Sequence, residues 1–524
     1  MRIVFADGVF ARLAPPRKMI ATKEQKDRKD RIPSLCVLWR QRFERRALLN
    51  VAVWVGLLVG AGVLWPEEAG QAHGFSALKV FALLAWGVGA FALAGRRGCA
   101  AWVGWPVALA GFLALQYVQV TPPSVRQHDV GGHREYIDHL AKERSLPAVR
   151  QGWETWQPPL YYVAAAVWRW PFSAVPFADP FRPVQFSAAV LYLTVIVAGL
   201  LMLRRLGFND LETVGTLGLL ALLPGHVFFA ARINNDVLLP FLGAGLLFVT
   251  AEFVKAASPV TGHSAPETRW LWWLAVLLPA LLATKSSSLA VVGGALALVF
   301  FAEARRSGWQ VALVRAYWTG LPAVLWQVFW WVRTAAQTGS PFYVNAALPD
   351  NLRVDAPAWR RLCSFDFAAF IGGGFYYDEP MRQSYPTALA ASLLYGEYGM
   401  HGYAFRWPEL LRWGCLGMLL VLAAGALVVP RAELRPVWIT CLVLVACQFA
   451  ITMTYAVQFP FACNQNMRFF APAFVPLCGL FGLGLAHFWE RGGQLARGAL
   501  AVMLTAFVLG LTDFYRCVLF GPSS

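Results

Sequence analysis

The sequence has little charge for its length. Only 14% of the 524 residues are Asp, Glu, Lys or Arg, 58% are hydrophobic, and the mean hydropathy is +0.51. A soluble globule of this size needs more polar residues to cover its surface. The composition therefore predicts an integral membrane protein.

Cysteine motifs are lacking as well. Nine cysteines are scattered along the chain without a C-x-x-C pair or a Cys/His ligand spacing, so neither a zinc site nor a disulfide framework is indicated. The sequence leaves open whether Cys363 and Cys463, both expected on the outer face, pair with each other. The formal net charge of +16 does not predict nucleic-acid binding, because Lys and Arg gather in short clusters beside apolar runs, where they orient helices.

No cleavage-type signal peptide precedes the first apolar run. Residues 1–47 are polar and basic, and the apolar run begins near Leu48, which is far from the start for such a signal. We expect residues 1–47 to form a cytoplasmic basic tail.

Candidate membrane spans occupy much of the chain, since a crossing helix needs about 20 apolar residues. Thirteen runs qualify, at roughly 48–65, 77–95, 99–119, 185–203, 213–231, 236–254, 270–284, 286–302, 316–333, 410–429, 437–457, 469–487 and 498–516. With the tail inside, short connections carrying Arg96-Arg97 or Arg204-Arg205 fall in the cytoplasm, as the positive-inside rule expects. This threading predicts an all-α polytopic bundle of about 13 transmembrane helices with the C-terminus outside.

The apolar segment at 158–172 does not fit this count. It carries Arg169 and is interrupted by Pro171, and a full crossing would move the Arg204-Arg205 pair to the outer face. We expect a short interfacial or re-entrant helix with its Trp and Tyr residues at the headgroup level, and a full span is the alternative.

Two long connections, at about 120–184 and 334–409, fall on the outer face in this topology. Long connections in a compact fold are usually functional, and we expect juxtamembrane helices within them. Three short polar interruptions reach the same face, at 232–236, 284–288 and 464–468.

The first outer connection contains two candidate acids. Asp129 follows the third span, and the two glycines soon after it are expected to let the backbone turn sharply. The pattern from His133 predicts a surface helix with Tyr136 on its apolar stripe. Glu154 precedes the rigid Gln157-Pro158-Pro159 step. The alternatives are that Asp129 is a solvated loop acid and that the proline step only marks the start of the next helix.

Three further polar positions each have a functional and a structural interpretation. Asn234, Asn235 and Asp236 introduce an apolar helix, where N-capping is the structural alternative. Lys285 lies between two apolar stretches, where an ionisable group marks a functional site unless it snorkels to the interface. Arg468 begins the twelfth span, where interfacial anchoring is the alternative.

Together these positions bring acids and cations to one membrane face. Such a combination suggests chemistry on a phosphate-linked lipid. A carboxylate can take a proton from an acceptor hydroxyl, while Lys and Arg stabilise the charge on a departing phosphate.

The arrangement resembles the GT-C superfamily of membrane glycosyltransferases, which includes protein O-mannosyltransferases and aminoarabinose transferases. The resemblance runs from about residue 99 to 490 and leaves an added transmembrane hairpin at 48–98 and a last span with the C-terminus at 491–524. The segments that match the family pattern are Asp129 with His133 and Tyr136, WETWQPPLYY, RINNDVL, LLATKSSSL, WWVRTAAQTGSPFY, SLLYGEYG and NQNMRFFAPAFVPL.

The resemblance implies transfer of a sugar from a polyprenyl-phosphate donor to a glycan, lipid or protein acceptor at the outer face of a bacterial inner or plasma membrane, with inversion at the anomeric carbon. Many members carry Asp-Glu where this chain has Asp129-Val130, so Glu154 is the candidate for the second acid. The implied catalytic residues are Asp129 and Glu154. The implied substrate-binding residues are His133, Tyr136, Gln157, Asn235, Asp236, Lys285 and Arg468.

A divalent metal ion is a further possibility, because metal use varies among such enzymes. His128, Asp129 and His133 offer an incomplete ligand set, and the alternative is that the histidines bond the acid or face the phosphate. A transporter or flippase is the rival function from another class, since intramembrane charge is also natural there. A lipid-linked glycan polymerase or ligase is a nearer alternative, and a scaffold without activity is a third.

Overall fold

The computed structural model describes residues 77–125, 127–258, 268–343, 352–372, 382–394 and 405–520. The regular secondary structure of these residues is helical, apart from an isolated antiparallel bridge between Arg353 and Phe461. The chain divides into two units, Met1–Trp54 and Val55–Ser524, and all described residues belong to the second. The predicted tail at 1–47 and the predicted span at 48–65 lie outside the described residues.

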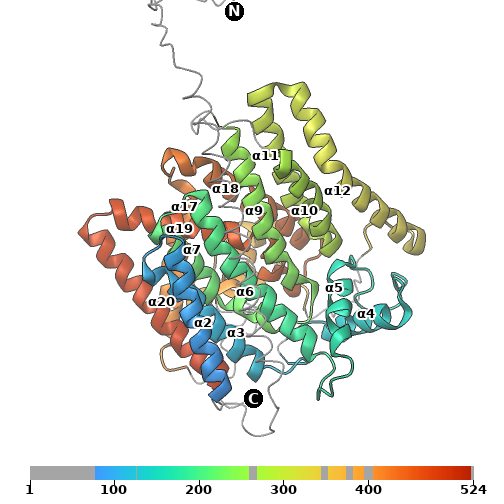
Figure 1. The fold of residues 1–524 in the computed structure, drawn as a ribbon, viewed down its shortest axis with the longest axis horizontal. Helices are drawn as coiled ribbons and strands as arrows, with labels where there is room; N and C mark the ends of the chain where they lie inside the picture. The colour runs from blue at the N-terminus through green and yellow to red at the C-terminus, as the bar shows by residue number, and fades with distance from the viewer. Residues whose placement is uncertain are drawn as a thin grey trace, which may run out of the picture. The chain divides into compact units, whose positions relative to one another are not determined.

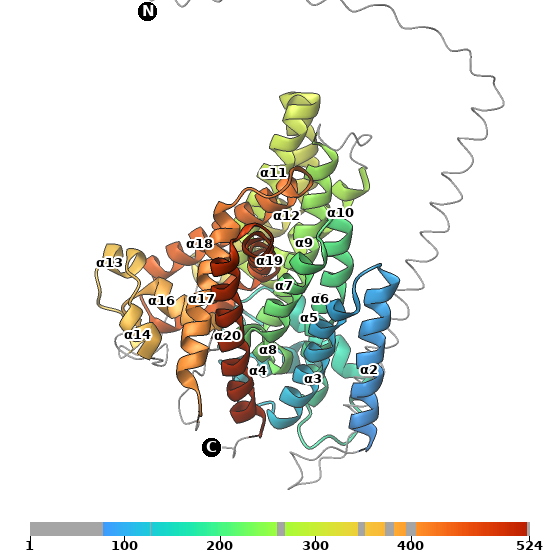
Figure 2. The same ribbon diagram turned by 90° about the vertical axis from the view of Figure 1, so that its left-hand side faces the viewer.

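Long helices form the bundle in Figures 1 and 2. They are α2 (Ala77–Arg96), α3 (Trp105–Val120), α6 (Arg182–Leu206), α7 (Asp210–Leu222), α9 (Leu239–Ala256), α10 (Thr268–Thr284), α11 (Leu289–Ser307), α12 (Trp309–Thr338), α17 (Pro408–Leu427), α18 (Arg435–Gln458), α19 (Phe474–Arg491) and α20 (Gln494–Phe520).

Shorter elements connect them. They are η1 (Ala101–Gly104), α4 (Val130–Glu143), α5 (Leu160–Arg169), η2 (Trp170–Phe172), α8 (Pro224–Val227), η3 (Phe228–Ala231), η4 (Asn235–Leu238), η6 (Ser286–Ser288), α13 (Ala358–Cys363), α14 (Phe367–Gly372), α16 (Tyr385–Leu394), η8 (Ala432–Leu434), η9 (Ala462–Gln465) and η10 (Met467–Ala473). The elements α13, α14 and α16, which come from the second long connection, lie to one side of the bundle in Figure 2.

The all-α polytopic membrane fold predicted from composition is confirmed. Within the described ranges, eight helical segments are long and apolar enough to cross a membrane, or nine if the bent pair of Asp210–Leu222 and Pro224–Ala231 is one span. The apolar helices at Val80–Arg96 and Thr268–Thr284 are shorter, and α12, which covers the predicted span at 316–333, is not among the eight. The total of thirteen therefore stays a prediction.

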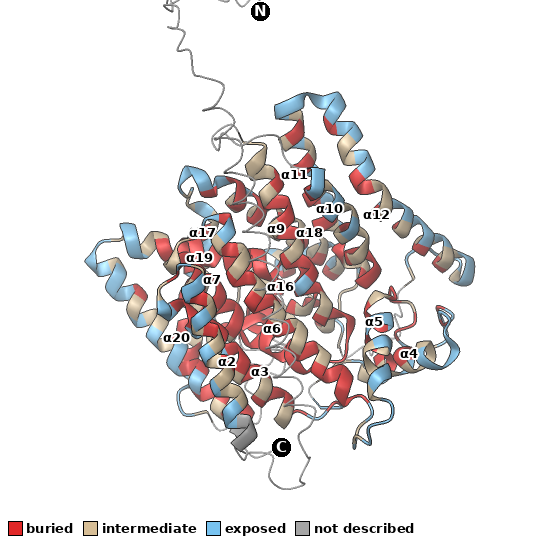
Figure 3. Ribbon diagram, viewed as in Figure 1, coloured by how far each residue is buried: buried red, intermediate tan, exposed pale blue. Residues whose placement is uncertain are grey.

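Helix α19 lies at the centre of the bundle, and buried residues gather around it in Figure 3. Of the most apolar window in Ala462–Arg491, 94% is buried, against 22% for Gln494–Leu519. Glycines allow the close approach of α17 to α19, since a Cβ on Gly425 would lie 1.8 Å from the carbonyl oxygen of Leu480 and one on Gly484 would lie 2.2 Å from that of Val421. Small residues serve this purpose between membrane helices, where packing drives association.

A bend of 60° separates α7 from α8 and η3, and side chains bond the backbone carbonyls that the bend leaves without helical partners. Pro224 has no N–H to donate to the carbonyl of residue 220, and His226 Nδ1 lies 2.8 Å from that oxygen. The hydroxyl groups of Tyr192 and Tyr515 donate to the next two carbonyls, at 2.7 and 2.8 Å. The bend directs the chain into residues 232–238, which carry part of the site.

Charged residues meet at the other end of the bundle. Arg204 pairs with Asp210 at 2.8 Å, Arg431 pairs with Glu212 at 2.7 Å, and Lys255 donates to the backbone carbonyl of Leu206 at 3.3 Å. Cations near helix C-termini also offset the helix dipole. Three of the connections predicted to be cytoplasmic, those with Arg204, Lys255 and Arg431, therefore meet at one end of the bundle, and the side of the membrane on which that end lies stays a prediction.

Helix α5 has ten residues and η2 continues it by three, so the segment at 158–172 is a short helix, and its interfacial or re-entrant placement stays a prediction. A ten-residue helix rises about 15 Å, roughly half of a bilayer's hydrocarbon core. The division of the chain at 98 and 490 stays a prediction, and α2 packs against α3, where Trp86 Nε1 donates to the carbonyl of Val107 at 2.7 Å. The cysteines of the described residues are free thiols, including Cys363 and Cys463.

Candidate functional site

Asp129 occupies a strained position at the start of α4. It is the N-cap residue, and its φ of 55° lies in the left-handed region, which few non-glycine residues adopt. The expectation that the following glycines make the turn is wrong, because both lie in the first turn of α4. Gly132 instead allows close packing, since a Cβ there would lie 3.0 Å from Trp153 Cβ and from Glu154 Cγ.

The two carboxylate oxygens of Asp129 have different neighbours. Oδ1 accepts a hydrogen bond from Trp153 Nε1 at 3.0 Å. Oδ2 lies 3.8 Å from Nη1 of Arg468, which is an ion-pair distance rather than a hydrogen bond. The Asp129 side chain is 34% exposed and that of Arg468 is 13% exposed, so the carboxylate is open to a substrate while the cation is mostly enclosed.

Gln127 fixes the segment that carries Asp129. Its Nε2 donates to the carbonyl oxygens of Pro123 and Ala231, and its Oε1 accepts from the backbone N–H of Ile233 at 2.8 Å. These bonds join the connection after α3 to the segment that leads into η4. Sequence reasoning missed Gln127, whose only signal was its place next to His128 and Asp129.

Asp236 and Lys285 form a buried, hydrogen-bonded ion pair, with side chains 3% and 8% exposed. Snorkelling of Lys285 is therefore not what the structure shows. N-capping by Asn234 is also wrong, since its side chain makes no cap bond. Asn235 instead donates through Nδ2 to Gln157 Oε1 at 3.2 Å and to the backbone carbonyl of Thr284 at 3.1 Å.

Phe469 joins the two cations. Lys285 Nζ lies 4.6 Å from the centroid of its ring and Arg468 Cζ lies 5.2 Å from the same centroid. Both contacts are within cation–π range. Asp129, Arg468, Phe469, Lys285 and Asp236 thus form one continuous set of contacts drawn from four separate parts of the chain. Asp129 contacts Arg468 directly and is connected to Lys285 only through Phe469.

Glu154 is buried close to this set, with 6% of the residue exposed. Burial, and to a smaller extent the negative charge of Asp129, raise its pKa to about 8, although Arg468, Lys285 and a hydrogen bond with Gln157 act in the opposite direction. Glu154 therefore carries a proton near neutral pH, unlike an ordinary glutamate. The two candidate acids lie near each other in different environments.

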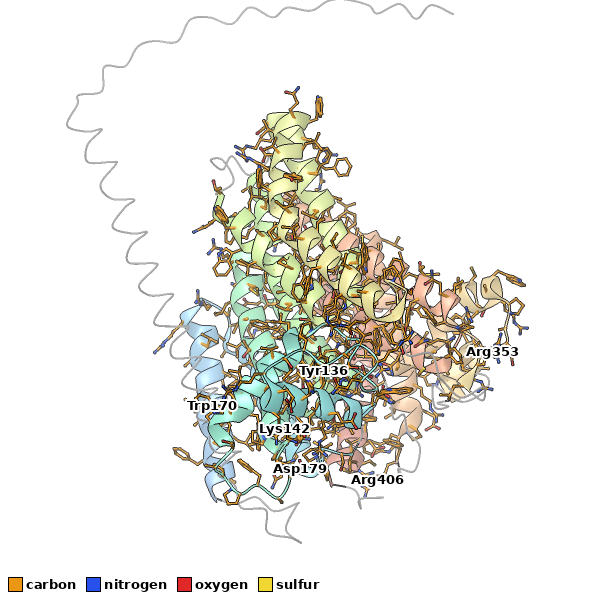
Figure 4. The ribbon with its side chains drawn as sticks, turned by 90° about the vertical axis from the view of Figure 1, so that its right-hand side faces the viewer. Tyr136, Lys142, Trp170, Asp179, Arg353 and Arg406 are labelled. Atoms are coloured by element: carbon orange, nitrogen blue, oxygen red, sulfur yellow. The ribbon has the colours of Figure 1, made fainter. Side chains whose placement is uncertain are left out.

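His133 and Tyr136 hold α4 against α5. His133 Nδ1 lies 2.9 Å from the hydroxyl of Tyr162, and burial lowers the pKa of this histidine to about 3. The rings of Tyr136 and Tyr162 stack at 4.0 Å, and the Tyr136 hydroxyl donates to the backbone carbonyl of Gln157 at 3.3 Å. Figure 4 labels Tyr136 and Lys142 on α4. The predicted binding residues His133 and Tyr136 therefore contact protein groups that support the Glu154 loop.

The predicted ligand set of His128, Asp129 and His133 is not assembled. Across the described ranges, no group of three or more His, Cys, Asp or Glu side chains is placed to hold a metal ion. His133 Nδ1 is engaged by Tyr162, and Oδ1 of Asp129 is engaged by Trp153. These residues do not fit a three-ligand metal centre in the arrangement seen here.

Comparisons with known proteins give a weak structural likeness. No protein-family model matches the sequence, and no curated protein matches it. The chain is similar to the Archaeoglobus fulgidus oligosaccharyltransferase tethered to an acceptor peptide containing the NVT sequon, with TM-score 0.44, 10% identity, and coverage of 80% of this chain and 56% of that chain.

It is also similar to the Archaeoglobus fulgidus oligosaccharyltransferase in complex with an inhibitory peptide and a dolichol-phosphate, with TM-score 0.42, 12% identity, and coverage of 79% of this chain and 55% of that chain. The chain spans about half the length of the solved structures it matches. A likeness this weak assigns no residue and no substrate to the present chain.

Proposed function

We propose that the protein is a membrane glycosyltransferase that moves a sugar from a polyprenyl-phosphate donor to an acceptor at the outer face of the membrane. The observation that carries the proposal is the contact between Asp129 and Arg468, at 3.8 Å, beside the buried Lys285–Asp236 pair. A partly exposed carboxylate can accept a proton and the guanidinium beside it can bind a phosphate, which are the two roles that displacement at a lipid-phosphate sugar needs.

Arg468 is the cation that we assign to the donor phosphate. A guanidinium presents planar N–H groups that match phosphate oxygens, and the enclosed position of Arg468 strengthens such contacts. The charge of Lys285 is already matched by Asp236. We therefore assign Lys285 mainly to holding Phe469, and with it Arg468, in place.

Asp129 is the group that we assign to the acceptor. As the acceptor oxygen bonds to the anomeric carbon, its proton passes to the carboxylate, and the bond from that carbon to the phosphate oxygen breaks. The electron pair of that bond leaves with the phosphate toward Arg468. Such a single displacement inverts the anomeric carbon. Glu154 is protonated near neutral pH and so is suited to donate a hydrogen bond rather than to act as a nucleophile.

The test is incubation of the purified protein with a panel of polyprenyl-phosphate sugars and candidate glycan, lipid and protein acceptors, followed by mass spectrometry. We expect consumption of one donor with release of polyprenyl phosphate. Movement of a labelled lipid across vesicles without consumption would instead establish a flippase. Products in which several sugar units are added to the carrier would point to a polymerase.

A further inference from the structure

The loop between α4 and α5 carries a residue that touches Asp129. Trp153, one position before Glu154, donates its indole N–H to Oδ1 of Asp129 at 3.0 Å and is 36% exposed. Its Cβ also packs against Gly132 in the first turn of α4. The indole therefore contacts both the side chain of the acid and the helix turn that presents it.

This loop is fastened to the C-terminal end of α12. Arg333 donates to the backbone carbonyl of Pro147, Val149 N–H donates to Gln337 Oε1 at 2.7 Å, and Arg150 donates to the carbonyl of Thr338 at 3.0 Å. These bonds come from consecutive turns of one helix end, and α4, α5 and that end of α12 lie together in Figure 1.

Hydrogen bonds within the loop connect the attached residues to the positions on both sides of Trp153. Thr155 Oγ1 donates to the carbonyl of Val149 at 3.0 Å and accepts from the backbone N–H of Gly152 at 3.0 Å. Val149 is fully buried. The residues on both sides of Trp153 are thus held in place, which restricts where its indole can lie.

We propose that Trp153 is a positioning residue for Asp129: its N–H holds Oδ1, so that Oδ2, which faces Arg468, is the oxygen that takes the acceptor proton. The end of α12 supports this role through Gln337. The proposal rests on the proposed function in assigning Asp129 to the acceptor. Without the indole bond, only the 3.8 Å contact with Arg468 restrains the carboxylate, and either of its two oxygens can make that contact.

The first test uses Trp153→Phe, which keeps an aromatic ring and removes the N–H. A hydrogen bond to a charged group corresponds to roughly a 10- to 100-fold effect, which we expect in kcat, with the KM for the donor changed by less than about threefold. Trp156→Phe is the matched control, because Trp156 lies in the same loop and donates no hydrogen bond to a described residue. Equal kcat values for the two variants would overturn the proposal.

The support from α12 is tested with a matched pair at Gln337. Gln337→Leu removes the oxygen that accepts from Val149, whereas Gln337→Glu keeps one. We expect a lower kcat for the leucine variant and recovery with glutamate. Similar kcat values for both variants would remove α12 from the proposal.

A second measurement does not depend on turnover. Thermal unfolding in detergent of Asp129→Asn, Trp153→Phe and the double variant forms a mutant cycle, and coupling between the two sites appears as non-additive shifts in Tm. Additive shifts would refute the contact even if the wild-type protein transfers sugar. Non-additive shifts in a protein that consumes no donor would refute the proposed function and leave the contact standing.

Discussion

Arg468 Nη1 lies 3.8 Å from Oδ2 of Asp129. The two residues are far apart in the sequence, since Asp129 follows the third predicted span and Arg468 precedes α19 and α20. Phe469, the neighbour of Arg468, extends this contact to Lys285, whose partner is Asp236. The acid is therefore tied to a defined set of side chains, although its own side chain stays 34% exposed.

Replacing Asp129 with Asn should abolish transfer, because the amide cannot take the acceptor proton. General-base catalysis supplies about 100- to 10,000-fold, so we expect a loss of at least about 100-fold in kcat. The control is Asp138→Asn within α4, since the Asp138 side chain is 36% exposed against 34% for Asp129 and also pairs with an arginine, Arg169. Wild-type turnover by the Asp129 variant, measured with the donor found in the panel, would contradict the assignment.

Replacing Arg468 with Gln should weaken use of the donor. Loss of charge-assisted bonds to phosphate predicts a KM for the donor raised by about 10- to 100-fold, measured from initial rates at varied donor concentration. Arg491→Gln serves as the control, because Arg491 is exposed at the far end of α19. An Arg468 variant whose donor KM stays at the wild-type value would assign the phosphate to other residues.

Lys285 and Asp236 should depend on each other for stability. Lys285→Gln leaves a buried carboxylate without its cation, and removal of one partner from such a pair costs about 3–5 kcal/mol. Asp236→Asn should destabilise for the converse reason. The double variant should recover part of the loss, as read from Tm in detergent. A double variant with the summed loss of both single changes would show that the pair is not coupled.

Glu154 should make the folded state less stable at high pH. Its pKa is raised from 4.5 to about 8 by burial, so the folded state keeps a proton that the unfolded chain releases. Stability is then fully present below about pH 4.5 and is lost as the pH rises to about 8, by a few kcal/mol in total. Glu154→Gln should remove this dependence in Tm measured against pH, and Glu135→Gln, at an exposed position of α4, should leave it intact. An unchanged slope in the Glu154 variant would contradict its protonation.

Reporters fused to truncated chains should establish the orientation. A reporter after residue 95, at the end of α2, is expected inside, and one after residue 180, just before α6, is expected outside. The prediction follows from the basic connections at the first end and is read from paired reporters that are active on opposite sides. The reverse pattern would place Asp129 in the cytoplasm and exclude an outer-face reaction.

The sequence alone determined that the protein is a helical membrane protein and which connections lie at the same end of its helix bundle. Apolar composition forces the chain into the bilayer, and strictly alternating helices must bring every second connection to the same side. The meeting of Asp129, Lys285 and Arg468 could be predicted on that ground, as could α4, whose apolar stripe contains the buried Tyr136.

Only the tertiary structure decided which side chains touch. Trp153 on Oδ1 of Asp129, Phe469 between the cations and the pairing of Lys285 with Asp236 depend on helix register and rotation, which apolar runs do not encode. The raised pKa of Glu154 likewise depends on its burial and on the nearby charges of Asp129, Arg468 and Lys285. A membrane sequence fixes the side on which a residue lies through hydropathy and charge, but contacts between side chains follow from packing.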